Sequence, residues 1–299
     1  MTMALISSYP SQVYDLHSHS TASDGQLSPT ALIQRALDKN IHTLALTDHD
    51  TVAGLEEAHK ANEAQEQPLN LINGVEISTG WHGYDIHIVG LHFDPTHTGL
   101  LELLSQQRHK RDQRARLIGE RLAKAGIEGA YEGACVYAQG AAVSRSHFAR
   151  WLVEKNYASD VNSVFSRYLA RGKTGYVPNQ WCSIQEAIEI LHQAGGVAVL
   201  AHPSRYKMSR KWLRRLLKEF KQSQGDGMEV IFAQQSIADR ASLIGLTQEF
   251  ALHCSLGSDF HQVTPWCDLG RNLHQPEVGS WIWQSPNWVN STYAQLIHE

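Results

Sequence analysis

The feature that most constrains the fold is an alternation of short apolar runs with helix-like segments, in two blocks of the chain. In the first block, strand-like runs at 13–16, 41–46, 69–77 and 84–91 accompany predicted helices at 28–39 and 52–64. In the second block, runs at 197–201, 228–232 and 252–256 alternate with helices at 183–195, 210–222 and 239–250. This pattern predicts an α/β fold built on a mainly parallel sheet or barrel.

Between the two blocks the alternation stops, and the sequence becomes helical and more basic. Helices are predicted at 101–125, 144–154 and 161–170, and a break is predicted at 126–133. The turn-forming residues Gly172–Gly175 and Pro178 mark the return to the α/β pattern. We therefore predict a barrel formed by residues 1–99 and 181–299, interrupted by a helical insertion at 100–180.

Composition places the chain among soluble globular proteins and excludes several function classes. The net charge of −4 gives no general attraction for nucleic acid, so any such binding needs a local basic patch. The four cysteines (Cys135, Cys182, Cys254 and Cys267) form no C-x-x-C pair, which argues against a zinc knuckle or a disulfide framework. The first ten residues carry no Lys or Arg before a short apolar stretch, so we expect no signal peptide, and no apolar run is long enough to span a membrane. We expect a cytoplasmic protein with no membrane partner.

Histidine is the residue type whose number stands out, with 17 copies in the chain. His17 and His19 follow the first predicted strand, and Asp24 lies five residues further on. Alternate side chains on a strand point the same way, so the two imidazoles can aim at one point, where a divalent ion would be held. By itself this H-x-H pair is equally compatible with two solvated histidines.

Side chains that can bind a metal ion also lie on or after nearly all of the remaining predicted strands. The complete set is His17, His19, Asp24, His49, Glu76, His87, His202, Asp259 and His261. The carboxyl ends of parallel strands gather on one face of such folds, so we expect these nine side chains to converge. One ion needs fewer ligands, so the number indicates two or three ions with bridging carboxylates. Mixed imidazole and carboxylate ligands suit Mn²⁺, Fe²⁺ or Zn²⁺ better than Mg²⁺ or Ca²⁺.

The motifs that carry these residues resemble those of a known family. In order, H-x-H with a downstream Asp, T-D-H-D, G-V-E-I-S, A-H-P and G-S-D-F-H resemble the PHP (polymerase and histidinol phosphatase) family over nearly the whole chain. The stretches TASDGQLSP, DIHIVGL, RGKTGYVP and QWCSIQEAI resemble its subgroup of stand-alone 3′,5′-nucleoside bisphosphate phosphatases and 5′-to-3′ exoribonucleases. The resemblance implies a distorted (β/α)7 barrel of PHP type, with the insertion lying over the active-site face.

The resemblance also implies a trinuclear site, usually of manganese, iron or zinc, and assigns its ligands. A first ion would be held by His17, His19, Glu76 and Asp259. Glu76 would bridge to a second ion held by His87 and His202. A third would be held by Asp24, His49 and His261.

Such a site predicts phosphoester hydrolysis without a protein nucleophile. Paired ions lower the pKa of a bridging water and neutralise the attacking and leaving oxygens, so a metal-bridging hydroxide is expected to attack phosphorus. We find neither a G-x-S-x-G elbow nor a P-loop. The expected reactions are removal of the 3′-phosphate of nucleoside 3′,5′-bisphosphates and 5′-to-3′ degradation of short 5′-phosphorylated RNA. No obligate protein partner is expected.

Three alternative functions remain open at this point. One is a histidinol-phosphate phosphatase, another is a non-catalytic metal-binding PHP module, and the third is a C–N hydrolase of the related amidohydrolase type.

Several residues outside the predicted metal shell are candidates for supporting roles. Candidates for phosphate binding are Arg145, Arg171, Lys173 and Arg205. The alternative for each is a solvated surface residue that does not contact substrate. Asp48 either fixes the tautomer of an imidazole or caps the helix predicted at 52–64. His147 is either a general acid or an ordinary helix-face histidine. The basic helix at 101–125 either binds along an RNA backbone or presents a solvated face. The second interpretation is favoured by Glu102, Asp112 and Glu120, which lie between its cations.

Overall fold

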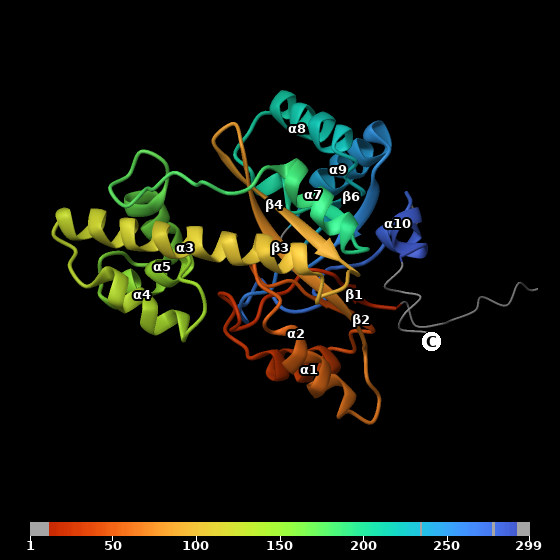
Figure 1. The fold of residues 1–299 in the computed structure, drawn as a ribbon, viewed down its shortest axis with the longest axis horizontal. Helices are drawn as coiled ribbons and strands as arrows, with labels where there is room; N and C mark the ends of the chain where they lie inside the picture. Colours follow the sequence, from red (N-terminus) through yellow and green to blue (C-terminus); the bar gives the residue numbers. More distant parts are fainter. Residues whose placement is uncertain (1–11, 234, 277–278, 292–299) are drawn as a thin grey trace, which may run out of the picture.

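A seven-stranded sheet forms the centre of the molecule (Figure 1). The computed structural model describes residues 12–233, 235–276 and 279–291. The strands follow one another in sequence order across the sheet. They are β1 (Tyr14–Asp15), β2 (Thr43–Leu46), β3 (Asn70–Trp81), β4 (Tyr84–Leu91), β5 (Val197–Leu200), β6 (Gly227–Ile231) and β7 (His253–Leu256).

The first and last strands meet, so the sheet is a nearly closed barrel. The backbone N–H of Leu16 donates to the carbonyl of Leu256 at 3.1 Å, and Ser18 forms a parallel bridge with Phe260. The predicted seven-stranded α/β barrel is therefore confirmed.

The sheet is mainly parallel, as expected, with one strand as the exception. β4 runs antiparallel to both β3 and β5, whereas the other paired strands are parallel. The reason is the turn at His82-Gly83, which has left-handed φ angles of 45° and 80° and joins β3 to β4 too tightly for a parallel crossover. As a result, His87 reaches the site from the middle of β4 rather than from the carboxyl end of a strand.

Helices cover the barrel and build the insertion. Around the barrel lie α1 (Pro29–Asp38), α2 (Leu55–Glu63), α7 (Ile184–Gln193), the short η2 (Pro203–Arg205), α8 (Arg210–Gln222) and α9 (Ile237–Phe250), with η3 (Ile282–Gln284) and α10 (Pro286–Val289) near the end of the described chain. The insertion comprises α3 (Thr98–Lys124), α4 (Ala130–Ala138), α5 (Arg145–Glu154), α6 (Val161–Val164) and the π-helical turn η1 (Phe165–Leu169). Side-chain caps begin α1 at Ser28 and α7 at Ser183, as their sequences indicate.

Helix α4 occupies part of the segment where a break was predicted. Gly129, with a φ of 72°, ends the glycine-rich turn, and the helix starts at the next residue. Ala130, Ala134 and Ala138 are buried at helical spacing, so a small apolar stripe stabilises α4 where the glycines indicated only a loop.

The insertion has a hydrophobic core separate from those of the barrel. Its buried cluster extends from Ala115 to Val177 and includes Phe148, Leu152 and Leu169. Helix α3 begins against the barrel and continues into the insertion, so that one rigid element connects the two (Figure 1). The exact boundaries at 100 and 180 stay a prediction.

Within the described residues, the structure contains no helix with the length and apolar character that crossing a membrane requires.

Candidate metal centre

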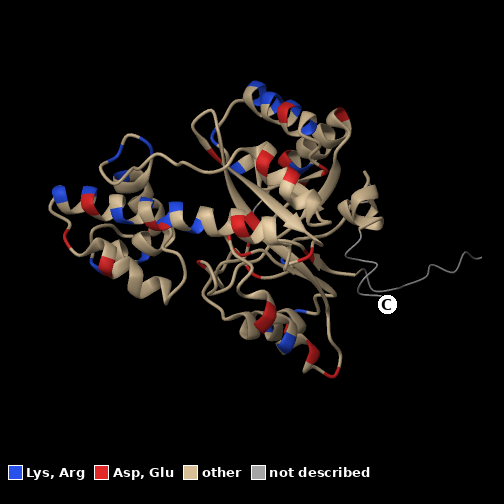
Figure 2. Ribbon diagram, in the orientation of Figure 1, with Lys and Arg blue, Asp and Glu red and all other residues tan. Residues whose placement is uncertain are grey.

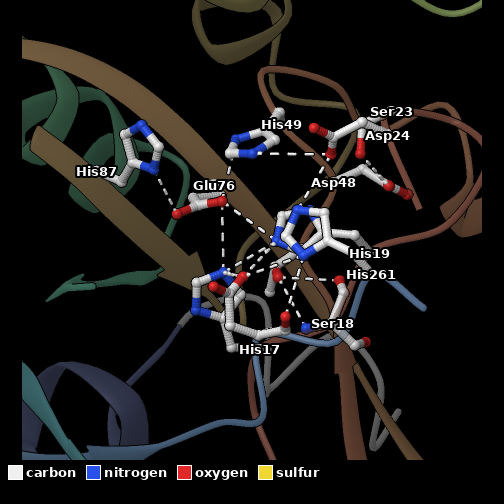
Figure 3. Close-up of polar contacts among 12 residues, drawn as sticks. His17, Ser18, His19, Ser23, Asp24, Asp48, His49, Glu76, His87 and His261 are labelled. Carbon is white, nitrogen blue, oxygen red and sulfur yellow. Dashed lines mark hydrogen bonds and ion pairs between the residues drawn. The ribbon is translucent and has the colours of Figure 1, made fainter. Parts of the chain in front are cut away.

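The segment Asp15–His19 enters the site from the end of β1. Asp15 accepts hydrogen bonds from the backbone N–H groups of Ser258 (2.8 Å) and Gly270 (2.9 Å), which attach this strand to the chain that follows β7. His17 and His19 are fully buried, and their Nε2 atoms lie 3.1 Å apart (Figure 3). The strand alternation therefore brings the two imidazoles to one point, as their spacing predicts.

The structure brings all nine predicted metal-capable residues together. Their ligand atoms form three overlapping groups, each with its atoms within 4.8 Å of one another: His17, His19, Glu76 and Asp259; His19, Asp24, His49 and His261; and His49, Glu76 and His87. The ninth residue, His202, joins through its Nε2 atom, which lies 3.0 Å from Glu76 Oε1. Glu76 is central, because it contacts imidazoles from four other segments of the chain (Figure 3).

Polar atoms in the cluster lack hydrogen bonds although they are buried. Among them are Asp24 Oδ1 and Glu76 Oε2, together with ring nitrogens of His19, His49 and His202. A buried polar atom without a hydrogen-bond partner is costly, so such a concentration is unusual in a folded protein. Divalent cations would supply partners for the two carboxylate oxygens, and imidazole with carboxylate is a donor set that suits them. The residues present therefore fit a metal centre.

The cluster keeps its carboxylates ionised despite burial. Burial favours the neutral form of Glu76, but His49, His87 and His17 hold its pKa well below the usual range. Burial likewise opposes charge on His19, yet the neighbouring carboxylates of Asp259 and Glu76 raise its pKa to about 10. Without ions, the raised pKa values of His17 and His19 keep these two rings protonated beside the carboxylates, whereas burial lowers the pKa of His49 to about 4. Cation binding is therefore expected to release protons from His17 and His19.

Three non-glycine residues of the site have a left-handed backbone. The φ angles are 50° at Asp50, 29° at His202 and 51° at Asp259. Such conformations cost energy and are retained where the surrounding structure requires them. His202 and Asp259 direct their side chains into the cluster, whereas Asp50 binds Arg111 and the backbone N–H of Ser78.

Glu229 on β6 belongs to the site but was missed in the sequence. Its Oε1 accepts a hydrogen bond from His17 Nδ1 at 2.7 Å, and its Oε2 accepts one from the backbone N–H of His202 at 2.6 Å. This bond to Nδ1 leaves His17 Nε2 facing the cluster. The sequence signal was one acidic residue within a strand whose other residues are apolar or glycine.

Asp48 supports the loop that carries Asp24. Its oxygens accept hydrogen bonds from the backbone N–H of Ser20 (2.8 Å) and from the hydroxyls of Ser20 and Ser23 (both 2.6 Å) (Figure 3). The following helix α2 begins at Leu55 with Gly54 at its cap position, so Asp48 does not cap it.

A cleft of ≈ 150 Å³ adjoins the metal cluster on the side of the insertion. Its lining includes His49, His87 and His261 from the cluster, and Arg111, Arg114 and Arg145 with Trp181 from the insertion and the segment after it. The cleft therefore places guanidinium groups beside the ligand cluster. Arg145 was predicted as a phosphate-binding candidate, whereas Arg111 and Arg114 were noted only as cations of the basic helix.

Asp85 on β4 holds two of these arginines. Its Oδ2 lies 2.9 Å from Arg145 Nη2 and 3.6 Å from Arg114 Nη2. Burial favours the neutral carboxyl, but Arg145 and Arg114 lower its pKa to about 2. Asp85 thus remains ionised at neutral pH and connects the barrel to α3 and α5.

The other candidate cations lie in different surroundings. Arg205 forms an ion pair with Asp259 at the cluster. Arg171 and Lys173 are exposed and are not among the residues that line the cleft. Contact between substrate and these last two residues stays a prediction.

His147 and two cations of the basic helix make structural contacts. His147 Nδ1 accepts a hydrogen bond from the backbone N–H of Ser144, which completes a capping box at the start of α5. Burial lowers the pKa of His147 to about 4, consistent with a neutral capping ring. On α3, Arg111 binds Asp50 and Arg114 donates to the carbonyl of Val177, so these cations face inward.

Comparison with known proteins agrees with this geometry. The model of the PHP domain family matches residues 15–230, which include seven of the nine clustered residues. The chain belongs to the PHP family. It is 53% identical over 287 residues to the 5′-3′ exoribonuclease Rnm of Escherichia coli (strain K12), covering 95% of this chain and 97% of that protein.

A curated relative and a solved structure, both from Chromobacterium violaceum, extend the comparison. The chain is 40% identical to the 3′,5′-nucleoside bisphosphate phosphatase of that bacterium, covering 90% of this chain and 95% of the relative. It also matches the solved structure of an amidohydrolase with bound sulfate from the same organism, at a TM-score of 0.85 and 41% identity, covering 91% of this chain and 94% of the other. The PHP-type barrel that the sequence predicts is thereby confirmed.

Proposed function

We propose that this PHP protein is a metal-dependent phosphoesterase with two related activities. It removes the 3′-phosphate of nucleoside 3′,5′-bisphosphates, and it degrades short 5′-phosphorylated RNA from the 5′ end. The observation that carries the proposal is the nine-residue cluster directly beside an arginine-lined cleft. Relatives with matching names over more than 90% of their length support the choice of substrate.

The cluster would hold three divalent ions, with Mn²⁺ as the first choice and Fe²⁺ or Zn²⁺ as alternatives. His17, His19, Glu76 and Asp259 would hold one ion, and Asp24, His49 and His261 would hold another. Glu76, His87 and His202 would hold the remaining ion. When bound, such ions activate water and neutralise charge on the phosphoryl oxygens.

The protein's own residues would bind and orient the substrate. Arg145 lies in the cleft with its guanidinium held by Asp85, so it is positioned to take a phosphate that is not being cleaved. Arg205, paired with Asp259, is placed to neutralise charge at the cluster itself. The indole of Trp181 lies beneath the guanidinium groups of Arg111 and Arg114, at 5.2 and 5.3 Å, and forms one wall of the cleft.

A phosphate-release assay tests the proposal directly. Mn²⁺-loaded protein should release phosphate from adenosine 3′,5′-bisphosphate and shorten 5′-phosphorylated oligoribonucleotides, and both activities should disappear after chelation. Failure on both substrates with a full metal complement would contradict the proposal. Faster turnover of histidinol phosphate than of the bisphosphate would favour the alternative phosphatase.

A further inference from the structure

Helix α8 carries the most concentrated positive surface of an otherwise acidic chain. Residues 207–222 contain seven Lys and Arg and one acidic residue, whereas the rest of the chain contains 19 Lys and Arg and 29 Asp and Glu. All seven cations are exposed. With 3.6 residues per turn, the six on the helix fall within an arc of about 140°. Figure 2 shows them as blue bands along α8.

Several of these cations are not neutralised within the protein. Arg214 pairs with Glu249 and Arg215 with Glu219. Lys207, Lys211 and Lys218 make neither an ion pair nor a hydrogen bond with any residue in the described part of the chain. Their charges are available to an external anion.

The buried side of α8 excludes insertion into a lipid surface. Leu216, Leu217 and Phe220 are fully buried in the barrel core. An amphipathic helix binds a membrane through its apolar face, and here that face is already covered. Only the cationic face is available, and its complement is a hydrophilic polyanion.

The basic surface starts at the rim of the metal centre. Helix α8 follows the loop that carries His202 and Arg205, and Arg205 contacts Asp259 of the cluster. A cleft of ≈ 430 Å³ lined by Ser204, Tyr206, Arg210 and Arg214, among other residues, connects this loop with the side of α8. From there the thirteen-residue helix extends the surface by about 20 Å.

We propose that Lys207 and the outer face of α8 bind the phosphates of an RNA chain whose 5′ end occupies the metal centre. The inference rests on the proposed exoribonuclease function and adds the path of the RNA beyond the cleaved nucleotide. The contacts are ionic, so binding is independent of base sequence and weakens as salt increases. A nucleoside bisphosphate has no further nucleotides that could extend along α8.

The test removes the three unpaired lysines together, in the variant K207A/K211A/K218A. Binding of the Mn²⁺-loaded protein to a 5′-phosphorylated, phosphorothioate-linked RNA of about 20 nucleotides is measured by fluorescence anisotropy across a salt series. We expect about tenfold weaker binding at low salt and a log–log salt slope reduced by about 2, since each lost phosphate contact removes about 0.7. Hydrolysis of adenosine 3′,5′-bisphosphate should be unchanged.

The matched control removes three exposed cations from other surfaces, in the variant K60A/K155A/R167A. It changes the net charge equally and should retain the wild-type salt slope. An α8 variant with the same slope and affinity as this control would overturn the proposal. If the wild-type protein hydrolyses neither substrate, the proposed function fails, while the anisotropy slopes still decide whether α8 binds RNA.

Discussion

At the scale of single residues, the cluster depends on side chains that hold its imidazoles as well as on the ligand candidates. Glu229 contacts two such residues at once, since one oxygen binds the His17 ring and the other binds the backbone of His202. His202 has a left-handed backbone that this hydrogen bond helps to maintain. One carboxylate on β6 therefore sets the orientation of ligands from two other segments.

Replacing Glu229 with Gln should weaken metal binding while preserving the fold. A carboxamide can accept only one of the two hydrogen bonds properly, and the loss of such an outer partner typically costs 10–100-fold in metal affinity or activity, so we expect about that range. The measurement is activity as a function of Mn²⁺ concentration. Recovery of the wild-type rate in excess Mn²⁺ would confirm a positioning role. The same replacement at Glu186, in an exposed helix cap, is the control and should leave the titration unchanged.

Replacing Arg145 with Ala should raise KM for a nucleoside 3′,5′-bisphosphate about tenfold, because hydrogen bonds to a charged group contribute about 1.5–3 kcal/mol. A nucleoside 3′-monophosphate, which lacks the second phosphate, should be affected little. Steady-state kinetics on both substrates check this, with the exposed Arg167→Ala variant as a control. Equal losses on the two substrates would show that Arg145 does not recognise the second phosphate.

At the scale of elements, α3 attaches the insertion to the barrel through its inward-facing polar residues. Gln107 donates to the carbonyl of Ser78 and accepts from the N–H of Cys182, and Arg111 binds both Asp50 and the hydroxyl of Ser78. A sequence shows that a helix is basic, but not which cations turn inward. RNA binding by the exposed cations of α3 stays a prediction.

Replacing Arg111 with Ala should destabilise the protein by about 3–5 kcal/mol, because it leaves the buried carboxylate of Asp50 without its partner. Urea unfolding of the metal-free protein measures this free energy. The double variant R111A/D50N removes both charges and should recover part of the loss. If the single and double variants are equally stable, the ion pair does not attach the helix as described.

The hairpin between β3 and β4 shows why a strand direction was missed. The sequence pattern ended the third strand at residue 77, so the remaining residues before 84 resembled a loop long enough for other connections. In the structure β3 continues to Trp81, and only His82-Gly83 separate it from β4. A boundary error of four residues concealed the tight turn and therefore the antiparallel pairing.

At the scale of the whole molecule, the sequence predicted most of the site because motif order reflects strand order. His17 and Asp259 are far apart in the chain but adjacent in space, since β1 and β7 close the barrel. Glu229 and Arg114 could not be assigned in the same way. Their roles depend on partners, His17 and Asp85, that only the folded chain brings within reach.

The central claim is that the converging side chains form one cluster of three divalent ions on which phosphoester hydrolysis depends. The most direct test is the metal content of Mn²⁺-loaded protein, measured by mass spectrometry together with phosphate release from adenosine 3′,5′-bisphosphate. We predict three ions per chain in the wild type, two in the Asp24→Ala variant, and a loss of activity with the missing ion. Full activity with no more than one ion per chain would contradict the account.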